Sequence, residues 1–359
     1  MGRIEGKLAN TPKEFHQVFA TRLLAWYDAH KRDLPWRKDR DPYRVWLSEI
    51  MLQQTRVAAV LDHYRRFLKR FPTVQKLAAA REASVLAAWS GLGYYRRARM
   101  LHAAAKRVVK EHGGKFPANS AGLLELPGIG RYTAGAIASI AFDEPVAVVD
   151  GNVARVVQRF FGMRITGGEV WQTAGAWLDA RRPGDFNQAM MELGATVCLP
   201  RQPRCLLCPV AELCATRGEL PAAGTASRQR KREIHFGLAR RNRAVFLVQR
   251  KKEESLMGGM WELPEIAPSS EKPMWSLRHS ITVTDYAVRV TEIASPNGAA
   301  GKWIPMQRLE SLPLTGLARK ILRRAEILLE TPKVAWIWNS ENKGHHRGRG
   351  GSLREANAF

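Results

Sequence analysis

Residues 126–152 read LPGIGRYTAGAIASIAFDEPVAVVDGN, and this stretch decides the fold of the first part of the chain. Gly128 and Gly130 stand where a tight turn needs positive φ, or where backbone N–H groups must approach a ligand closely. We expect a helix at 120–125 and another directly after the glycines. A hairpin at a helix N-terminus offers free backbone donors, which suits a phosphate. By itself the pattern fits an ordinary turn between two helices equally well.

The end of the same stretch carries an isolated carboxylate. An apolar run at 145–149 leads to Asp150, and a new helix is predicted to start at Val153. Asp150 therefore falls at or near a helix N-cap, where a carboxylate is favoured for purely structural reasons. Capping and chemistry both remain open for this residue.

Composition restricts the class of protein and its partners. The chain has 359 residues, 45% of them hydrophobic, which is enough for two domains with real cores. Its net charge of +24 and isoelectric point near 10.5 indicate an acidic polymer as partner. We find no apolar run of membrane-spanning length and no hydrophobic leader at the N-terminus. We therefore expect a soluble, cytoplasmic protein that is a monomer and has no membrane partner.

The first two hundred residues predict a run of amphipathic helices, broken by two notable loops. Glu49 lies at the margin of the apolar face of a predicted helix at 43–55, where it is either a functional carboxylate or a solvated neighbour of the core. The loop at 33–37 is rich in exposed-type groups. The loop at 91–94 can present Leu92 and Tyr94 outward as wedges between bases, but a buried loop anchor is the commoner explanation for apolar loop residues. The other helices are predicted at 13–29, 56–70, 82–90, 95–112, 153–161, 170–181 and 186–197.

All four cysteines lie in one short segment. Cys198, Cys205, Cys208 and Cys214 are separated by six, two and five residues. A zinc ribbon usually offers two closely spaced pairs, and only one pair here has that spacing. Four thiolates in a compact loop also suit a [4Fe–4S] cluster. Spacing alone favours iron–sulfur over zinc only modestly.

The pattern changes after the cysteines. The basic segment at 226–233 is interpreted as an interdomain linker. Beyond it, period-two segments predict strands at 244–249, 279–283 and 286–290, followed by a helix at 316–329. These elements predict a small α+β domain at 234–330. The Gly-, His- and Arg-rich end, 331–359, is interpreted as a flexible basic tail.

Taken in order, several of these motifs carry a family resemblance. LSEIMLQQT with Glu49, LPGIGRYTAGAI, Val149–Asn152 and the cysteine spacing together resemble the adenine DNA glycosylases of the MutY type, from about 13 to 329. The resemblance implies a mainly α helix–hairpin–helix catalytic region at 1–225. Within it we expect a six-helix barrel at about 34–145 and an iron–sulfur domain from 1–33 plus 146–218. It also implies a Nudix-like domain at 234–330. The segment 256–265, LMGGMWELPE, matches that domain, but the signature of an active Nudix hydrolase is absent, so recognition rather than hydrolysis is expected.

The resemblance also implies a function and its residues. A monofunctional glycosylase would flip adenine, mispaired with 8-oxoguanine or guanine, out of double-stranded DNA and remove it by hydrolysis. Glu49 would protonate adenine N7 and Asp150 would stabilise the oxocarbenium ion, with Tyr132 and Asn152 positioning them. Tyr132 stands where the bifunctional endonuclease III relatives have a Schiff-base lysine, so no efficient strand cutting is expected.

Further positions follow from the same resemblance. They are the adenine pocket (Trp36, Arg37, Glu192), the DNA contacts (Gln54, Thr55, Leu92, Tyr94, Gly128, Gly130, Arg131, with a monovalent cation at the hairpin), the cluster ligands (Cys198, Cys205, Cys208, Cys214) and the 8-oxoguanine contacts (Ser280, Thr282). The chain departs from the family at 279–283, which reads HSITV instead of carrying an aromatic–Ser–His sequence. This departure puts strong damage discrimination in doubt. A different class of function also fits the charge and the cysteines, namely a non-catalytic DNA-binding iron–sulfur protein, but it leaves Glu49 and Asp150 unexplained.

Overall fold

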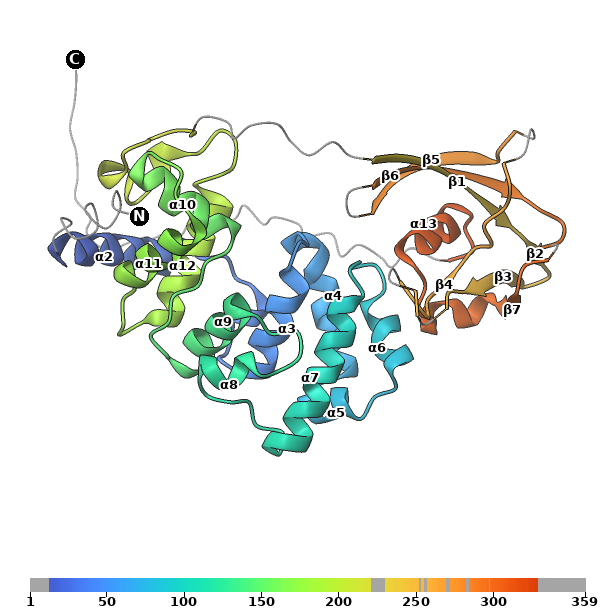
Figure 1. Cartoon of the computed structure of the whole chain (residues 1–359), viewed down its shortest axis with the longest axis horizontal. Helices are drawn as coiled ribbons and strands as arrows, with labels where there is room; N and C mark the ends of the chain where they lie inside the picture. The colour runs from blue at the N-terminus through green and yellow to red at the C-terminus, as the bar shows by residue number, and fades with distance from the viewer. Residues whose placement is uncertain are drawn as a thin grey trace, which may run out of the picture.

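Helices make up the first part of the protein, and two small sheets with a helix make up the last (Figure 1). The computed structural model describes residues 13–220 and 230–328, except 252, 255–256, 269–271, 282–283 and 297. The predicted tail at 331–359 therefore lies outside the described residues, as does Thr282. In the described part of the chain, no helix has the length and apolarity needed to cross a membrane.

From residue 13 up to the cysteine segment the described chain forms twelve elements, and two short 3-10 turns lie within that segment. They are α2 (Lys13–His30), η1 (Pro35–Arg37), α3 (Pro42–Leu52), α4 (Val57–Arg70), α5 (Val74–Ala78), α6 (Glu82–Trp89), α7 (Arg96–His112), α8 (Ser120–Leu124), α9 (Arg131–Phe142), α10 (Gly151–Phe161), α11 (Gly167–Trp177), α12 (Pro183–Thr196), η2 (Cys205–Leu207) and η3 (Ala211–Leu213).

These helices enclose two separate apolar cores. The first is built from buried residues between Leu34 and Val148, on η1 and α3 to α9, together with Met260 from the C-terminal region. The second joins residues of α2 to residues of α10, α11 and α12. Figure 1 shows α2 lying beside α11 and α12, although more than a hundred residues separate them in the chain. The segment 146–150 connects the two cores and carries Asp150.

Some helix ends differ from the predicted ones, for local reasons. The helix predicted at 43–55 ends at Leu52, because Gln53 leaves the helical conformation with ψ of 115° and Gln54 then adopts a left-handed backbone with φ of 54°. The helix predicted at 170–181 runs from Gly167 to Trp177, because Thr166 and Glu169 form a reciprocal capping box at its start. The short helix α5 was not predicted.

The C-terminal region is α+β. Its strands are β1 (Arg230–Leu238), β2 (Arg240–Arg241), β3 (Ala244–Gln249), β4 (Trp261–Glu262), β5 (Trp275–Ile281), β6 (Thr284–Glu292) and β7 (Gly301–Pro305), with η4 (Met306–Ser311) and α13 (Gly316–Arg324) after them. One sheet has the order β1-β6-β5, with β1 parallel and β5 antiparallel to β6. In the other, β3 pairs with β2, β4 and β7. One side of α13 packs into the core of this region.

The predicted linker at 226–233 was too long at its C-terminal end. Residues 230–233 begin β1, where Arg230 is paired with Thr284 of β6. The side chains of Arg230, Lys231 and Arg232 are exposed, as their charges require, while their backbone pairs with the neighbouring strand. The strand was missed because its first residues are charged, whereas strand pairing depends on backbone hydrogen bonds. Residues 226–229 lie outside the described residues.

Candidate active site

Glu49 is buried inside the helical region. It lies in the last two turns of α3, whose start is capped by Asp41, and its exposed fraction is 7%. The Tyr132 hydroxyl on α9 donates a hydrogen bond of 2.6 Å to Glu49 Oε2. Burial raises the pKa of Glu49 to about 7; the negative charge of Asp150 adds to the rise, while the Tyr132 hydrogen bond opposes it. The solvated alternative for Glu49 is thus wrong.

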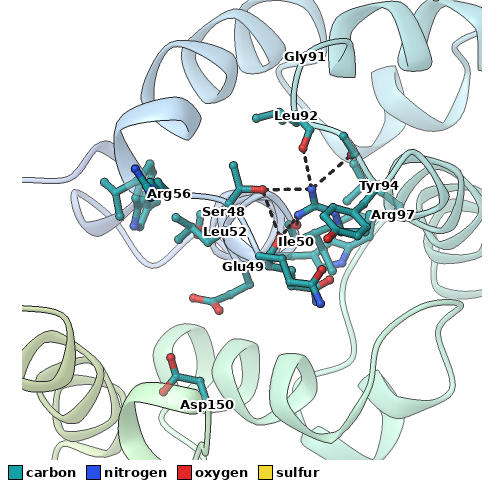
Figure 2. Close-up of a pocket in the computed structure, with 18 of the residues that line it drawn as sticks. Ser48, Glu49, Ile50, Leu52, Arg56, Gly91, Leu92, Tyr94, Arg97 and Asp150 are labelled. Carbon is teal, nitrogen blue, oxygen red and sulfur yellow. Dashed lines mark hydrogen bonds between the residues drawn. The ribbon is translucent and has the colours of Figure 1, made fainter. Parts of the chain in front are cut away.

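Asp150 caps α10 and also faces Glu49. Its Oδ1 accepts from the Val153 amide at 2.7 Å, and its Oδ2 accepts from the Asn152 side chain at 2.8 Å. Figure 2 shows its carboxylate and that of Glu49 directed into the same open space. The capping interpretation and the functional one are therefore compatible, since capping fixes the orientation of the carboxylate.

Asn152 is held in one orientation by a residue that the sequence did not reveal. The Arg155 guanidinium donates at 2.8 Å to Asn152 Oδ1 and at 2.8 Å to the Gly194 carbonyl. Because the side-chain oxygen of Asn152 receives this donor, its NH₂ group is directed to Asp150. A Cβ at Gly194 would lie 2.5 Å from the Asn152 Cβ, so glycine is required for α12 to approach α10 this closely.

Glu192 joins two arginines beside this pair. It has an exposed fraction of 1%, and its carboxylate accepts from Arg32 Nε at 2.6 Å, Arg32 Nη2 at 2.8 Å and Arg37 Nη2 at 2.8 Å. Burial alone would raise the pKa of Glu192, but the Arg32 and Arg37 guanidinium groups outweigh it and hold the pKa below its ordinary value. Glu192 is therefore a fixed negative charge. Arg32 was not predicted, because its partner is 160 residues away.

The loop at 33–37 is not the exposed loop that was expected. Leu34 and Trp36 are buried, and the Trp36 ring contacts Tyr64 edge to face at 5.3 Å. The short helix η1 turns Trp36 into the first core while Arg37 reaches Glu192. Trp36 therefore forms a fixed apolar wall next to Glu192.

A single groove of about 1840 Å³ gathers most of the predicted positions. Glu49 and Asp150 line it, and the C-terminal region contributes His279, Ser280 and α13. The predicted site residues along it are Trp36, Arg37, Glu49, Gln54, Thr55, Leu92, Tyr94, Gly128, Tyr132, Asp150, Asn152, Glu192 and Ser280. Gly130 and Arg131 do not line this groove; Gly130 caps α9, and the Arg131 guanidinium stands 3.9 Å from the centre of the Trp171 ring.

Two side chains at the groove stand on unusual backbone. Gln54 and Tyr94 have φ values of 54° and 47°, in the left-handed region that non-glycine residues rarely adopt. Tyr94 is 48% exposed, as predicted. Leu92 has an exposed fraction of 6% and belongs to the first core, which agrees with the interpretation of this residue as a buried loop anchor. The loop is anchored by Leu92 and presents Tyr94.

Arg97 connects the two segments that carry these side chains. Its guanidinium donates to the carbonyls of Ile50 at 2.8 Å, Met51 at 3.1 Å and Gln53, which belong to the last turn of α3 and the residue after it. It also donates to Leu92 O at 3.3 Å and to Gly93 O at 3.4 Å. Burial lowers the pKa of Arg97 to about 10. One partly buried cation thus fixes the end of the Glu49 helix against the loop of Tyr94 (Figure 2).

The hairpin has the geometry that its glycines suggest. Gly128 has φ of 75°, and a Cβ there would lie 2.5 Å from Met100 Cβ. Gly130 has φ of −97° and precedes the first turn of α9. Positive φ is therefore required only at Gly128, while the chain at Gly130 leads into the exposed N-terminus of α9.

The four cysteines stand apart from the groove. All four are free thiols of intermediate exposure, and all line one small cavity of about 30 Å³. Arg159 lies among them, donating to Cys198 Sγ at 3.4 Å and to Leu199 O at 2.6 Å. Among the described residues, no three His, Cys, Asp or Glu side chains are grouped so that they could hold a metal ion.

Comparisons with known proteins agree with this arrangement. A family model described as "HhH-GPD superfamily base excision DNA repair protein" matches residues 47–177. The adenine DNA glycosylase of Rattus norvegicus is 52% identical over 215 residues, covering 55% of this chain and 41% of the relative. That of Arabidopsis thaliana is 40% identical over 311 residues, covering 73% and 49%. The chain spans less than half the length of these relatives.

One shorter relative is covered more fully, and two solved structures share the fold. The adenine DNA glycosylase of Buchnera aphidicola from Acyrthosiphon pisum is 30% identical, with 79% of its length covered. A thermostable thymine-DNA glycosylase has a TM-score of 0.53 at 30% identity, covering 56% of this chain and 96% of its own. An endonuclease III–DNA covalent intermediate has a TM-score of 0.51 at 23% identity, covering 57% and 97%, which shows a shared fold only. With its motifs and its relatives in agreement, this chain belongs to the adenine DNA glycosylase family.

Proposed function

We propose that this protein is a monofunctional DNA glycosylase of base excision repair, which extrudes adenine mispaired with 8-oxoguanine or guanine and hydrolyses its bond to deoxyribose. The observation that carries the proposal is the pair of carboxyl groups in one groove. Glu49 is buried with a pKa near 7, and Asp150 faces the same space with two donors fixed on it. Two carboxyl groups that face one space, one of them with a raised pKa, suit acid-assisted cleavage of a glycosidic bond.

Each acid has a distinct task in the proposed reaction. Near neutral pH a large fraction of Glu49 carries a proton, which it donates to N7 of the extruded adenine. The bond from C1′ to N9 then breaks and its electron pair leaves with the base. Asp150 stabilises the resulting oxocarbenium ion. Water adds to C1′, and the proton that it loses returns to Glu49.

Tyr132 supports base removal without strand cleavage. Burial and the Glu49 charge raise its pKa well above its ordinary value, so its hydroxyl stays neutral and donates to Glu49. A neutral hydroxyl cannot form the Schiff base that strand cleavage by an amine requires. The expected product is therefore an intact strand with an abasic site.

The remaining groove residues suit the recognition of an extruded base. The Trp36 wall and the Arg37–Glu192 pair supply an apolar face and fixed polar groups for adenine. Gln54 and Tyr94 would occupy the gap in the duplex, and Thr55 would contact the opposite base. Leu92 anchors the loop that carries Tyr94. The hairpin residues Gly128, Gly130 and Arg131 would hold the DNA backbone, with a monovalent cation.

The C-terminal region is proposed as a Nudix-like domain that recognises rather than hydrolyses. It places Ser280 on the groove, where its hydroxyl is hydrogen-bonded to Asp285. Ser280 is our proposed contact for 8-oxoguanine; Thr282, the other, lies outside the described residues. The helical region corresponds in this proposal to a six-helix barrel around the first core and an iron–sulfur domain around the second.

The four cysteines are proposed as the ligands of a [4Fe–4S] cluster, around which their side chains would have to gather. Four free thiols share one cavity, which is the donor set that such a cluster requires, and Arg159 supplies a positive charge beside them. When bound, the cluster would hold the segment 198–214 as a rigid loop. The effect would reach the active site through Arg155, whose Nε donates to the Cys198 carbonyl at 2.8 Å while its Nη2 holds Asn152.

Cluster binding predicts colour and iron. Purified protein is expected to be brown, with broad visible absorption that bleaches on acid treatment, and to contain about four irons per chain. Cys208→Ser should lose most of this absorption and iron, because it removes one of four ligands. Absorption and metal analysis by mass spectrometry measure both. A folded, colourless protein loaded with zinc would contradict the cluster.

The activity itself is tested by base release. Duplexes carrying adenine opposite 8-oxoguanine, guanine or thymine are incubated with excess protein. We expect free adenine from the first two, and strand breaks only after alkali, because no amine attacks the sugar. Adenine is measured by chromatography and breaks by gel electrophoresis. Tight binding of the mismatched duplex with no adenine release would instead support a non-catalytic DNA-binding protein.

A further inference from the structure

The last helix of the C-terminal region has one strongly basic face. α13 has the sequence GLARKILRR and carries Arg319, Lys320, Arg323 and Arg324 without an acidic residue between Gly316 and Arg324. Its other face is apolar and buried in the C-terminal core. Cations near a helix C-terminus also stabilise the helix dipole, so the sequence of α13 is not by itself evidence of a ligand.

The basic face of α13 lies on the substrate groove. All four basic residues line the groove that contains Glu49 and Asp150, and Figure 1 places α13 on the side of the C-terminal region that faces the helical region. Lys320 and Arg324 are exposed and stand four residues apart, so they lie on the same side of the helix. The basic face is therefore directed at the substrate groove.

The hydrogen-bond acceptors that hold Lys320, Arg324 and Arg319 in the described part of the chain are neutral. Lys320 Nζ donates to the Arg278 carbonyl at 3.0 Å, and Arg324 donates to the Ser276 carbonyl at 3.4 Å. Arg319 Nε donates to the Ser90 hydroxyl at 3.0 Å. Neutral acceptors orient a cation but do not neutralise it, so the positive potential extends into the groove.

Hydrogen bonds fix α13 relative to the loop at 91–94. Ser90 Oγ and Tyr95 Oη donate to the Leu314 carbonyl at 2.8 and 3.1 Å, just before α13 begins. The extruded nucleotide would enter on the Glu49 side of the groove, which is formed by the helical region. The complementary strand would then lie closest to the C-terminal side, where α13 stands.

We infer that the basic face of α13, centred on Lys320 and Arg324, binds phosphates of the strand complementary to the one that loses its base. This inference rests on the proposed function for its strand assignment. It gives the C-terminal region a backbone contact that does not depend on the altered loop at 279–283. Such contacts set affinity and register without reading the sequence.

Salt dependence of binding tests the contact. The probe is a duplex with a non-hydrolysable 2′-fluoro-adenosine opposite 8-oxoguanine. The double variant Lys320→Gln/Arg324→Gln should reduce the slope of log affinity against log salt by about 1.8, because each phosphate contact contributes about 0.9. The charge-preserving pair Lys320→Arg/Arg324→Lys should restore the wild-type slope.

A matched pair on another helix controls for net charge. Lys106 and Lys110 on α7 are also exposed, also four residues apart and do not line the groove. Lys106→Gln/Lys110→Gln removes the same charge and should leave the slope close to that of wild type. Equal slopes for the α13 variant and this control would overturn the proposal. Thermal unfolding of each variant shows that the comparison is between folded proteins.

Neutral methylphosphonates test which strand is contacted. Placed in the complementary strand, they should weaken wild-type binding but cause little further loss in the α13 variant. If this non-additivity appears only with methylphosphonates in the adenine strand, the strand assignment is wrong.

Adenine release by wild-type protein is measured separately. If the α13 variant changes the salt slope but wild-type protein releases no adenine, the α13 contact stands and the glycosylase activity is rejected. If wild-type protein releases adenine but the α13 variant keeps the wild-type slope, the glycosylase activity stands and the α13 contact is rejected.

Discussion

Glu49→Gln is expected to slow adenine release by on the order of 10²–10⁴-fold while the protein stays folded. Glutamine has nearly the same shape and still accepts the hydrogen bond from Tyr132, but it has no proton to give to N7. Single-turnover release from the adenine:8-oxoguanine duplex measures the effect. Glu125→Gln, which changes an exposed glutamate at the end of α8, is the control and should keep the wild-type rate. Equal rates for Glu49→Gln and wild type would remove the general acid from the mechanism.

The raised pKa of Glu49 also predicts a pH dependence. Wild-type release should fall as pH rises through about 7, because the protonated form disappears.

The stability of the folded protein should change in the same pH range. The pKa of Glu49 is higher in the folded protein than its ordinary 4.5, so folding is penalised increasingly between pH 4.5 and 7 and fully above pH 7. Glu49→Gln should therefore be more stable than wild type at pH 8, by up to about 3 kcal/mol, and should lose this advantage near pH 4. Denaturant unfolding at the two pH values measures the difference.

Asp150→Asn is the second large effect, with an expected loss on the order of 10²–10³-fold in release rate. Asparagine is also a good N-cap, so α10 should still begin at Gly151 while the negative charge is lost. Removing that charge also removes one cause of the high pKa of Glu49. The pH at which the residual activity falls should therefore move downward. The pH profile of single-turnover release measures both changes.

A matched capping variant separates charge from helix capping. Asp41 caps α3 by accepting from the Arg44 amide at 3.0 Å, and it does not line the groove. Asp41→Asn makes the same chemical change at another N-cap and should leave the release rate near wild type. If Asp150→Asn matches Asp41→Asn in rate, Asp150 is only a cap. An upward move in the pH profile of Asp150→Asn would contradict its electrostatic effect on Glu49.

The sequence predicted much of the coarse fold and the family. The helical region followed by an α+β region is confirmed, as is membership of the adenine DNA glycosylase family. Helix periodicity carries enough information to locate α2, α4 and α7 almost to their ends. The motifs around Glu49 and Asp150 indicated two acids. The sequence did not show that α3 packs against α9, and it is this tertiary contact that brings Tyr132 to Glu49.

The parts that could not be predicted depend on long-range partners. Arg32, Arg97 and Arg155 look like solvent-exposed charges in a basic chain. Each instead satisfies carboxylate or carbonyl oxygens contributed by segments distant in the sequence. For Leu92 the sequence left two positions open, an outward wedge and a buried anchor, and its place in the first core is settled only by tertiary packing. A local pattern shows that a loop is unusual but does not show which of its side chains turns inward.

Met260 has a consequence for how the protein meets DNA. By sequence it belongs to the C-terminal region, yet its fully buried side chain lies in the first helical core. Pulling the two regions apart would expose it, at about 2 kcal/mol before any hydrogen bond is broken. In the proposed complex, a duplex would therefore meet a groove whose two sides are already held together by this contact.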